Sequence, residues 1–230
     1  MREALNNQSP LPSPLRRLVL LVAITLALIV PSASRSVAAA DARTVVERMI
    51  ARNPSLASYK ARVHIHFTMF NFPWYASNLD GTSYFKRPNN YEVVFDKVPW
   101  YAKSFPRLFD DVGDPMSWLR TENIELLGST SLKAKPYMLL KLTKKIHSSI
   151  IAYSLAYIDP KTYTLDRMEW HYVSGGRIVM TQHYAEEGNY SVIVSQRAEI
   201  DIPHVRALAT SVYDPYQTNV AVNDTVFTNK

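Results

Sequence analysis

Apolar and polar residues alternate along two stretches of the chain, residues 59–69 and 79–95. In the first stretch every second residue from Ala61 to Met69 is apolar, and the residues between them are arginine, histidine and threonine. The second stretch alternates on both sides of an Arg-Pro-Asn-Asn sequence at residues 87–90. A two-residue period is typical of a strand with one buried face, and proline followed by asparagine is typical of a turn. The pattern predicts a long first strand and then a strand, a turn and a strand.

Before and after these stretches, the pattern predicts two helices and a run of further strands. Residues 44–52 place Val45, Val46, Met49 and Ile50 on one helical stripe that ends before Pro54. A short helix is expected from Pro115, capped by Asp114. The further strands are expected at 123–127, 137–143, 150–158, 164–173, 178–184, 190–197, 205–213 and 216–222. Turn residues recur about every ten positions, at 159–160, 175–176, 188–189 and 214–215. This spacing predicts an antiparallel meander, sandwich or barrel.

The first forty residues have the pattern of a secretory signal peptide. Arg16 and Arg17 precede an apolar run over 18–30, and Pro31 and small residues up to Ala40 follow it. The run is shorter than the roughly 17–25 apolar residues of a membrane-spanning helix, although a retained anchor is the alternative. We therefore expect export, with residues 1–40 as the signal peptide and residues 41–230 as one domain.

Charge and cysteine content narrow the classes of function. The chain carries a net charge of +6, but the 22 lysines and arginines of residues 41–230 face 19 aspartates and glutamates, which leaves +3. The basic character therefore gives little support to a nucleic-acid partner. The chain has no cysteine, which excludes disulfides, thiol catalysis and lipidation at a cleavage-site cysteine.

Few residue patterns point to a metal or to catalysis. His64 and His66 project from one face of the predicted first strand, and they are read either as part of a zinc site or as two solvated histidines. No third ligand has suitable spacing, and the chain lacks the nucleophile-elbow, zincin and phosphate-loop motifs. The acidic pairs at 110–111 and 186–187 would face opposite sides of a strand, which does not suit paired-carboxylate chemistry. We expect a protein that is not an enzyme and uses no metal or cofactor.

Alternation also selects a set of apolar residues that share one strand face. These residues line a cavity if the face is left open, and they form a dry core if it is filled. They are Val63, Ile65, Phe67, Met69, Phe85, Tyr91, Val93 and Phe95. Extending the same alternation to Arg87 places its guanidinium beside Phe85, where it needs hydrogen-bond acceptors. A turn arginine that reaches into solvent is the alternative. The aromatic connection at 70–78 either contacts a membrane or partner or folds over the core.

The sequence G-T-S-Y-F-K-R-P-N at residues 81–89 resembles the periplasmic lipoprotein carriers, the LolA-like family. Three further segments are similar to that family in order and composition: residues 56–59 before the first strand, the Pro-Met-x-x-Leu sequence at 115–119, and the strand–turn–strand at 157–165. The chain departs from the family at 97–111, where a proline- and aromatic-rich segment replaces an expected hairpin.

The resemblance implies a mainly β, α+β fold. This fold is a curved antiparallel half-barrel that does not close, with an N-terminal helix and short lid helices over an apolar cavity for acyl chains. It implies that Arg87 holds the lid closed through hydrogen bonds. It further implies a periplasmic carrier of lipoprotein or lipid acyl chains, with an inner-membrane transporter and an outer-membrane acceptor as partners. An envelope lipid sensor or regulator of the same fold is the alternative.

Overall fold

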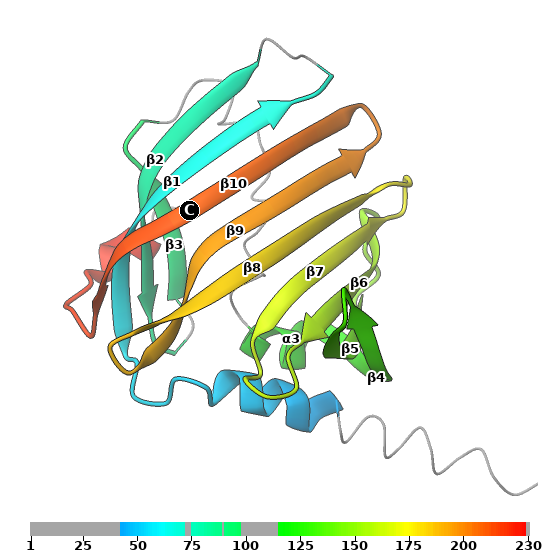
Figure 1. Cartoon of the computed structure of the whole chain (residues 1–230), viewed down its shortest axis with the longest axis horizontal. Coiled ribbons are helices and arrows are strands. Elements are labelled where there is room, and N and C mark those ends of the chain that lie inside the picture. Colours follow the sequence, from blue (N-terminus) through cyan, green and yellow to red (C-terminus); the bar gives the residue numbers. More distant parts are fainter. Residues whose placement is uncertain (1–41, 72–74, 89, 98–114, 229–230) are drawn as a thin grey trace, which may run out of the picture. The chain divides into compact units, whose positions relative to one another are not determined.

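The computed structural model describes residues 42–71, 75–88, 90–97 and 115–228. One ten-stranded antiparallel sheet dominates it, with the strand order β3-β2-β1-β10-β9-β8-β7-β6-β5-β4 (Figure 1). The strands are β1 (Ser58–Met69), β2 (Ala76–Lys86), β3 (Asn90–Phe95), β4 (Glu122–Leu132), β5 (Lys135–Lys144), β6 (Ile151–Ile158), β7 (Leu165–Tyr172), β8 (Arg177–Glu187), β9 (Tyr190–Ile202) and β10 (Val205–Thr218).

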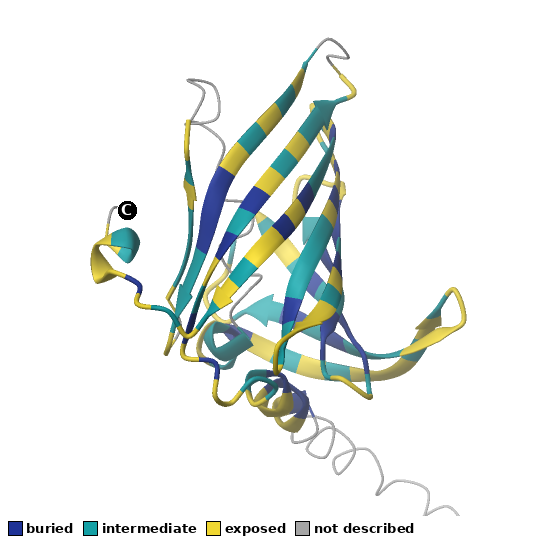
Figure 2. Ribbon diagram, turned by 60° about the vertical axis from the view of Figure 1, so that its left-hand side comes forward, coloured by how far each residue is buried: buried dark blue, intermediate teal, exposed yellow. Residues whose placement is uncertain are grey.

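The sheet is strongly curved but not closed. Strands β3 and β4 form its two edges and do not pair with each other among the described residues. Figure 2 shows the strands curling around a concave side, with buried residues spread along them. The predicted α+β half-barrel is therefore confirmed. Every pair of neighbours except β1 and β10 is joined by a direct connection along the chain, which explains the regular turn signals.

Strand β10 corrects one prediction. The sequence suggested two strands at 205–213 and 216–222 with a turn at Asp214 and Pro215, but residues 205–218 form one strand. Pairing with β1 shifts its register at this point, since Ala61 lies opposite Tyr216 whereas Val63 lies opposite Tyr213. Asp214 and Pro215 therefore form a β-bulge, which tolerates a proline that has no N–H to donate.

Two helices pack their apolar residues into the core. The N-terminal helix covers residues 42–50 and buries Val45, Val46 and Met49 of the predicted stripe, while Ile50 is partly buried. Helix α3 (Pro115–Thr121) buries Trp118. A short 3-10 helix, η3 (Asp224–Phe227), follows the last strand. Within the described part of the chain, no helix has both the length and the hydropathy that crossing a bilayer requires.

The core lies between these helices and the concave side of the sheet. It joins helix residues such as Val45 and Trp118 to inward-facing residues of β5 to β10, among them Leu140, Met168 and Ile200. Several predicted features lie outside the described residues. They are the signal peptide at 1–40, the aromatic residues at 72–74, and the segment 98–114 with the helix cap at Asp114.

Candidate functional site

The eight apolar residues selected by alternation all lie on the concave face of the sheet. Tyr59 pairs with Phe85, which in turn pairs with Tyr91, and in the same way Val63 pairs with Gly81 and then with Phe95. Directly paired residues of neighbouring strands point to the same side of a sheet. The register therefore brings the predicted residues of β1, β2 and β3 together on a single surface, which we call the inner face.

Most of this surface is not sealed. Of the eight residues, Val63 alone is fully buried, and the other seven are only partly buried. Phe67 and Met69 pack against the edge of the core. Apolar side chains in a filled core are usually almost completely buried. Within the described part of the chain, the inner face over β1, β2 and β3 thus keeps apolar surface that is only partly buried.

A cluster of tyrosines lies at one end of the inner face. The ring of Tyr59 stacks on Phe85 at 5.4 Å and meets Tyr216 edge-on at 5.2 Å between ring centroids. Burial raises the pKa of Tyr59, Tyr213 and Tyr216, and the neighbouring tyrosines raise the pKa of each further. These hydroxyls therefore stay protonated even above about pH 10, where a free tyrosine ionises.

Arg87 lies one residue beyond the end of β2, where its side chain is exposed to solvent but also bonded to the backbone. Its Nε donates a hydrogen bond of 2.6 Å to the carbonyl of Leu56, and its Nη2 donates to the carbonyl of Asn53. Both carbonyls belong to the segment that joins the N-terminal helix to β1. The guanidinium thus fastens this segment, which we call the helix connection (residues 51–57), to the end of β2.

No protein-family model matches the chain, and no curated protein matches its sequence. Solved structures do match. A putative outer membrane lipoprotein-sorting protein domain from Vibrio parahaemolyticus has a TM-score of 0.67 at 10% identity, over 82% of this chain and 97% of that one. A LolA superfamily protein from Nitrosomonas europaea has a TM-score of 0.61 at 13% identity, over 81% and 96%. The chain has a LolA-like fold.

A DUF1329 family protein from Desulfovibrio piger is similar in the same way, with a TM-score of 0.64 at 9% identity over 81% of this chain and 96% of that one. Each of these structures is matched over almost its whole length. At such low identity the likeness concerns the LolA-like fold alone, so the function has to be argued from this chain's own residues.

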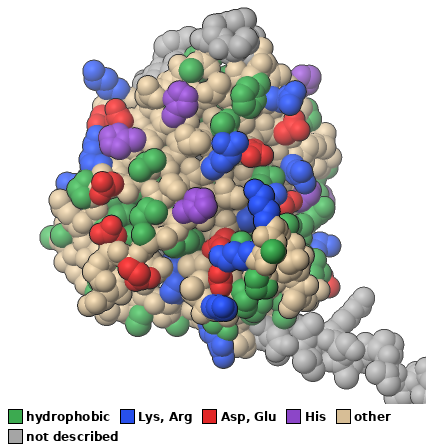
Figure 3. Space-filling view, in the orientation of Figure 1, with side chains coloured by type: hydrophobic (Ala, Val, Ile, Leu, Met, Phe, Trp, Pro, Cys, Tyr) green, Lys and Arg blue, Asp and Glu red, His purple; other side chains and the backbone are tan. Residues whose placement is uncertain are grey.

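The outer face of β1 carries polar side chains at the positions between its inward apolar residues. His64 and His66 are exposed there and bond through Nδ1 to Asp80 at 2.7 Å and Asn78 at 2.8 Å. Among the described residues, no group of three or more histidine, cysteine, aspartate and glutamate side chains is arranged to hold a metal. Figure 3 shows lysine, arginine, aspartate and glutamate side chains interspersed on the face in view. Positive and negative charges are therefore mixed on that face, and neither sign dominates the electrostatic potential there.

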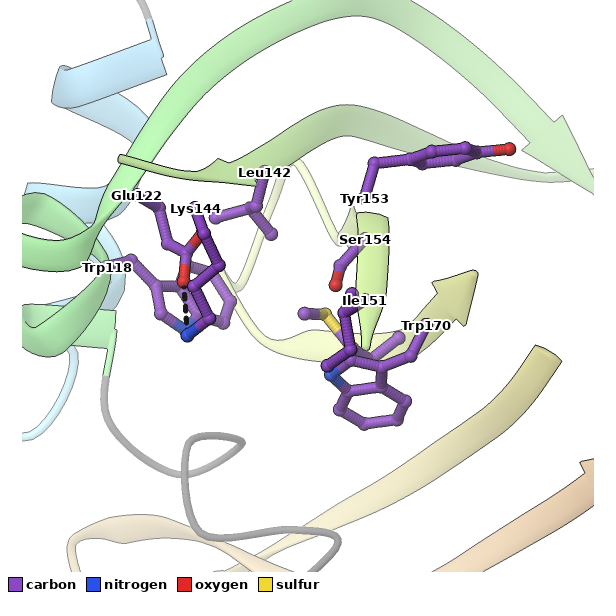
Figure 4. Close-up of a pocket in the computed structure, with 9 residues that line it drawn as sticks. Trp118, Glu122, Leu142, Lys144, Ile151, Tyr153, Ser154 and Trp170 are labelled. Atoms are coloured by element: carbon purple, nitrogen blue, oxygen red, sulfur yellow. Dashed lines mark ion pairs between the residues drawn. The ribbon is translucent and has the colours of Figure 1, made fainter. Parts of the chain in front are cut away.

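A small pocket lies between α3 and the strands at the β4 edge of the LolA-like sheet (Figure 4). Its walls include Trp118 and Trp170, and an ion pair of 2.7 Å between Lys144 and Glu122 lies at its side. The volume is about 30 Å³, which is room for about two water molecules. The pocket is too small for an acyl chain, and we assign it no part in binding one.

Sequence reasoning missed the polar residues of the inner face on β8 and β9. Gln182 and Gln196 occupy inward positions directly opposite each other, next to the apolar pair Met180 and Ala198. Strand alternation in 178–184 already places Gln182 on the same side as Met180. The sequence therefore contained one signal, a polar residue at an inward position. What that residue contacts depends on the strands that pair beside it.

Proposed function

We propose that this protein is an exported carrier that binds the acyl chains of a lipid or lipoprotein on the inner face of its half-barrel. The observation that carries the proposal is the incomplete burial of the apolar residues on β1, β2 and β3. In this proposal Val63, Ile65, Phe67, Met69, Phe85, Tyr91, Val93 and Phe95 contact the acyl chain. The signal-peptide pattern of residues 1–40 supports the periplasm as the place of action.

The energetics favour long, largely apolar ligands. Each methylene removed from water contributes about 0.8 kcal/mol, so a chain of about a dozen carbons gains roughly 10 kcal/mol. Association itself costs an estimated 4–15 kcal/mol, which leaves little net affinity for short chains. A carrier must also release its ligand, so moderate net affinity suits this function.

Arg87 gives the site a point of control in this proposal. Its bonds to the carbonyls of Leu56 and Asn53 hold the helix connection, and with it the N-terminal helix, against the end of β2. Breaking these bonds would loosen that helix from the concave side. An inner-membrane transporter that loads the ligand and an outer-membrane acceptor that receives it are the partners such a carrier requires.

The first test is whether the purified protein contains lipid. The exported protein is prepared without detergent, its bound lipid is extracted, and the extract is analysed by mass spectrometry. Uptake of a fluorescent fatty acid is measured on the delipidated protein. We expect bound acyl species and saturable uptake, and the absence of both would refute the proposal.

Two neighbouring valines of β3 provide a matched pair of variants. Val93 points to the inner face, whereas Val94 is 44% exposed on the opposite face. Val93→Trp should occupy part of the binding surface and reduce uptake, and Val94→Trp should leave uptake unchanged. Circular dichroism confirms that both variants fold. Equal uptake by the two variants would show that the acyl chain does not bind where we place it.

A further inference from the structure

A row of polar side chains crosses the inner face of β8, β9 and β10. Gln182 pairs directly with Gln196, and Gln196 pairs directly with Ser211. Gln182 and Ser211 are 4% and 8% exposed, so they are buried within the fold. Ile65 continues the row on β1, so the polar row runs into the apolar surface of β1, β2 and β3.

Apolar side chains lie directly beside this polar row. The next row of paired positions holds Met180, Ala198 and Ala209, and Phe67 continues it on β1. Ile178 and Ile200 pair in the row after that. These residues of β8 and β9 belong to the buried core, so a ligand on the inner face would meet accessible hydrocarbon on β1, β2 and β3 and hydrogen-bonding groups at the polar row.

Most polar atoms of the row have partners within the fold. The hydroxyl of Tyr213 donates a 2.7 Å hydrogen bond to Oε1 of Gln196, and Oγ of Ser211 donates a weaker one at 3.4 Å. The hydroxyl of Tyr184 donates a 2.8 Å hydrogen bond to Oε1 of Gln182. Burial raises the pKa of Tyr184, so its hydroxyl stays protonated and keeps the Gln182 carboxamide oriented.

The amide nitrogen of Gln182 is the exception. Nε2 is buried and has no hydrogen-bond partner among the described residues. An unsatisfied buried donor destabilises a fold, and native proteins usually give such a group a partner. Since the Oε1 atom is already held by Tyr184, Nε2 remains as a fixed donor that lies next to apolar rows. The ligand chemistry that satisfies such a donor is a carbonyl oxygen attached to hydrocarbon chains.

We propose that Gln182 Nε2 donates a hydrogen bond to an ester carbonyl of the bound lipid, so that the inner face selects acyl esters over plain hydrocarbon. This inference rests on the proposed carrier function and adds to it the chemical class of the ligand. The acyl chain lies on the partly accessible apolar surface of β1, β2 and β3, and the ester sits at the polar row. Gln196 and Ser211, which already bond within the fold, line the same row.

The test compares two ligands of equal size on the delipidated exported protein. A long-chain fatty acid methyl ester and the alkane with the same number of heavy atoms each displace a bound fluorescent fatty acid. The alkane removes more apolar surface from water than the ester, so the hydrogen bond is measured from the ratio of the two affinities. For one added hydrogen bond we expect the ester-to-alkane affinity ratio to be about 5- to 10-fold higher in the wild-type protein than in a variant that lacks the amide. An equal ratio in the two proteins would overturn the inference.

Gln182→Met removes the amide at nearly constant length. We expect this variant to bind the alkane as the wild type does and to lose the preference for the ester. Gln217→Met is the matched control, because Gln217 is exposed on β10 and pairs with Lys60; it should keep the preference. Infrared spectra of a carbonyl-labelled ester give a second readout. The carbonyl band should move to lower frequency on binding to the wild type and should move less with Gln182→Met.

The outcomes separate the two proposals. Binding of both ligands with an ester preference that survives Gln182→Met would overturn this inference and leave the carrier function intact. Failure of the wild-type protein to bind any acyl ligand would refute the carrier function and this inference together.

Discussion

Removing the Arg87 guanidinium is the most direct way to loosen the helix connection that it holds at the end of β2. Arg87→Ala deletes the donors to the carbonyls of Leu56 and Asn53 without removing buried apolar surface. Arg87→Lys keeps the charge, but a single ammonium group cannot reproduce the fixed fork of a guanidinium. The alanine variant should therefore lose both contacts, and the lysine variant should lose about half of their effect.

The size of the effect follows from the exposure of the side chain. Hydrogen bonds to a charged group contribute about 1.5–3 kcal/mol each when they are shielded. Arg87 is exposed, so water replaces part of each bond, and we expect Arg87→Ala to cost about 1–2 kcal/mol in total. A paired hydrogen bond between Asn53 and Ser191 still holds the helix connection, with distances of 2.8 and 3.1 Å. The helix should consequently open more often but stay folded.

Hydrogen exchange measured by mass spectrometry can locate this opening. A loss of about 1.4 kcal/mol makes local opening about tenfold more frequent, so peptides covering residues 42–57 should exchange about tenfold faster in Arg87→Ala. Lys86→Ala is the control, because Lys86 contacts Asp224 and the Val222 carbonyl instead. That variant should speed exchange only near residues 219–228. Unchanged exchange at 42–57 in Arg87→Ala, or equal acceleration there by Lys86→Ala, would refute the assignment of Arg87 as the fastening residue.

Three further predictions concern stability. Burial raises the pKa of Tyr59 and Tyr213, so the folded protein keeps protons that the unfolded chain releases above about pH 10. The free energy of unfolding, measured in urea, should therefore fall above that pH. A free energy that does not change with pH there would contradict this prediction. Burial alone would raise the pKa of Asp159, but bonds from Lys135 and two backbone N–H groups lower it overall. Its carboxylate therefore stabilises the fold above about pH 4, and Asp159→Asn should weaken the dependence of stability on pH during acid titration. Gly81→Ala would place a Cβ 2.7 Å from a backbone carbonyl of β3, so chemical denaturation should show a loss of about 1–3 kcal/mol unless β3 moves without cost.

Alternation was sufficient to predict the inner face of the first three strands. Their hydrophobic period is clear, the connection between β2 and β3 is short, and the eight predicted residues share one side of the sheet because direct pairing preserves it. Local pattern failed at Asp214 and Pro215, which have the composition of a turn but lie inside a strand. Whether such a pair ends a strand or forms a bulge depends on β1, which lies far away in sequence.

Gln182 shows a second limit of local reasoning. The alternation in residues 178–184 puts this side chain on the inward side, but a single polar residue at an inward position has no evident meaning by itself. Its meaning comes from Gln196 and Ser211, which other strands place beside it, and from Tyr184, which uses one of its two polar atoms. Residues that are far apart in sequence become neighbours only when the whole sheet has formed, so a local pattern cannot reveal such pairs.

The pairing of β1 with β10 has a consequence for the order in which the protein can assemble. The first and last strands meet in the interior of the sheet, and they connect the β2–β3 side to the β9–β4 side. Until residues 205–218 emerge, the chain can form only two separate pieces, each with a bare strand edge that is prone to pair with other molecules. Such long-range pairing is slow to form. The two pieces join late, so the chain cannot complete its tertiary structure until nearly the whole sequence is available. A translocation channel likewise requires that a chain passing through it is unfolded.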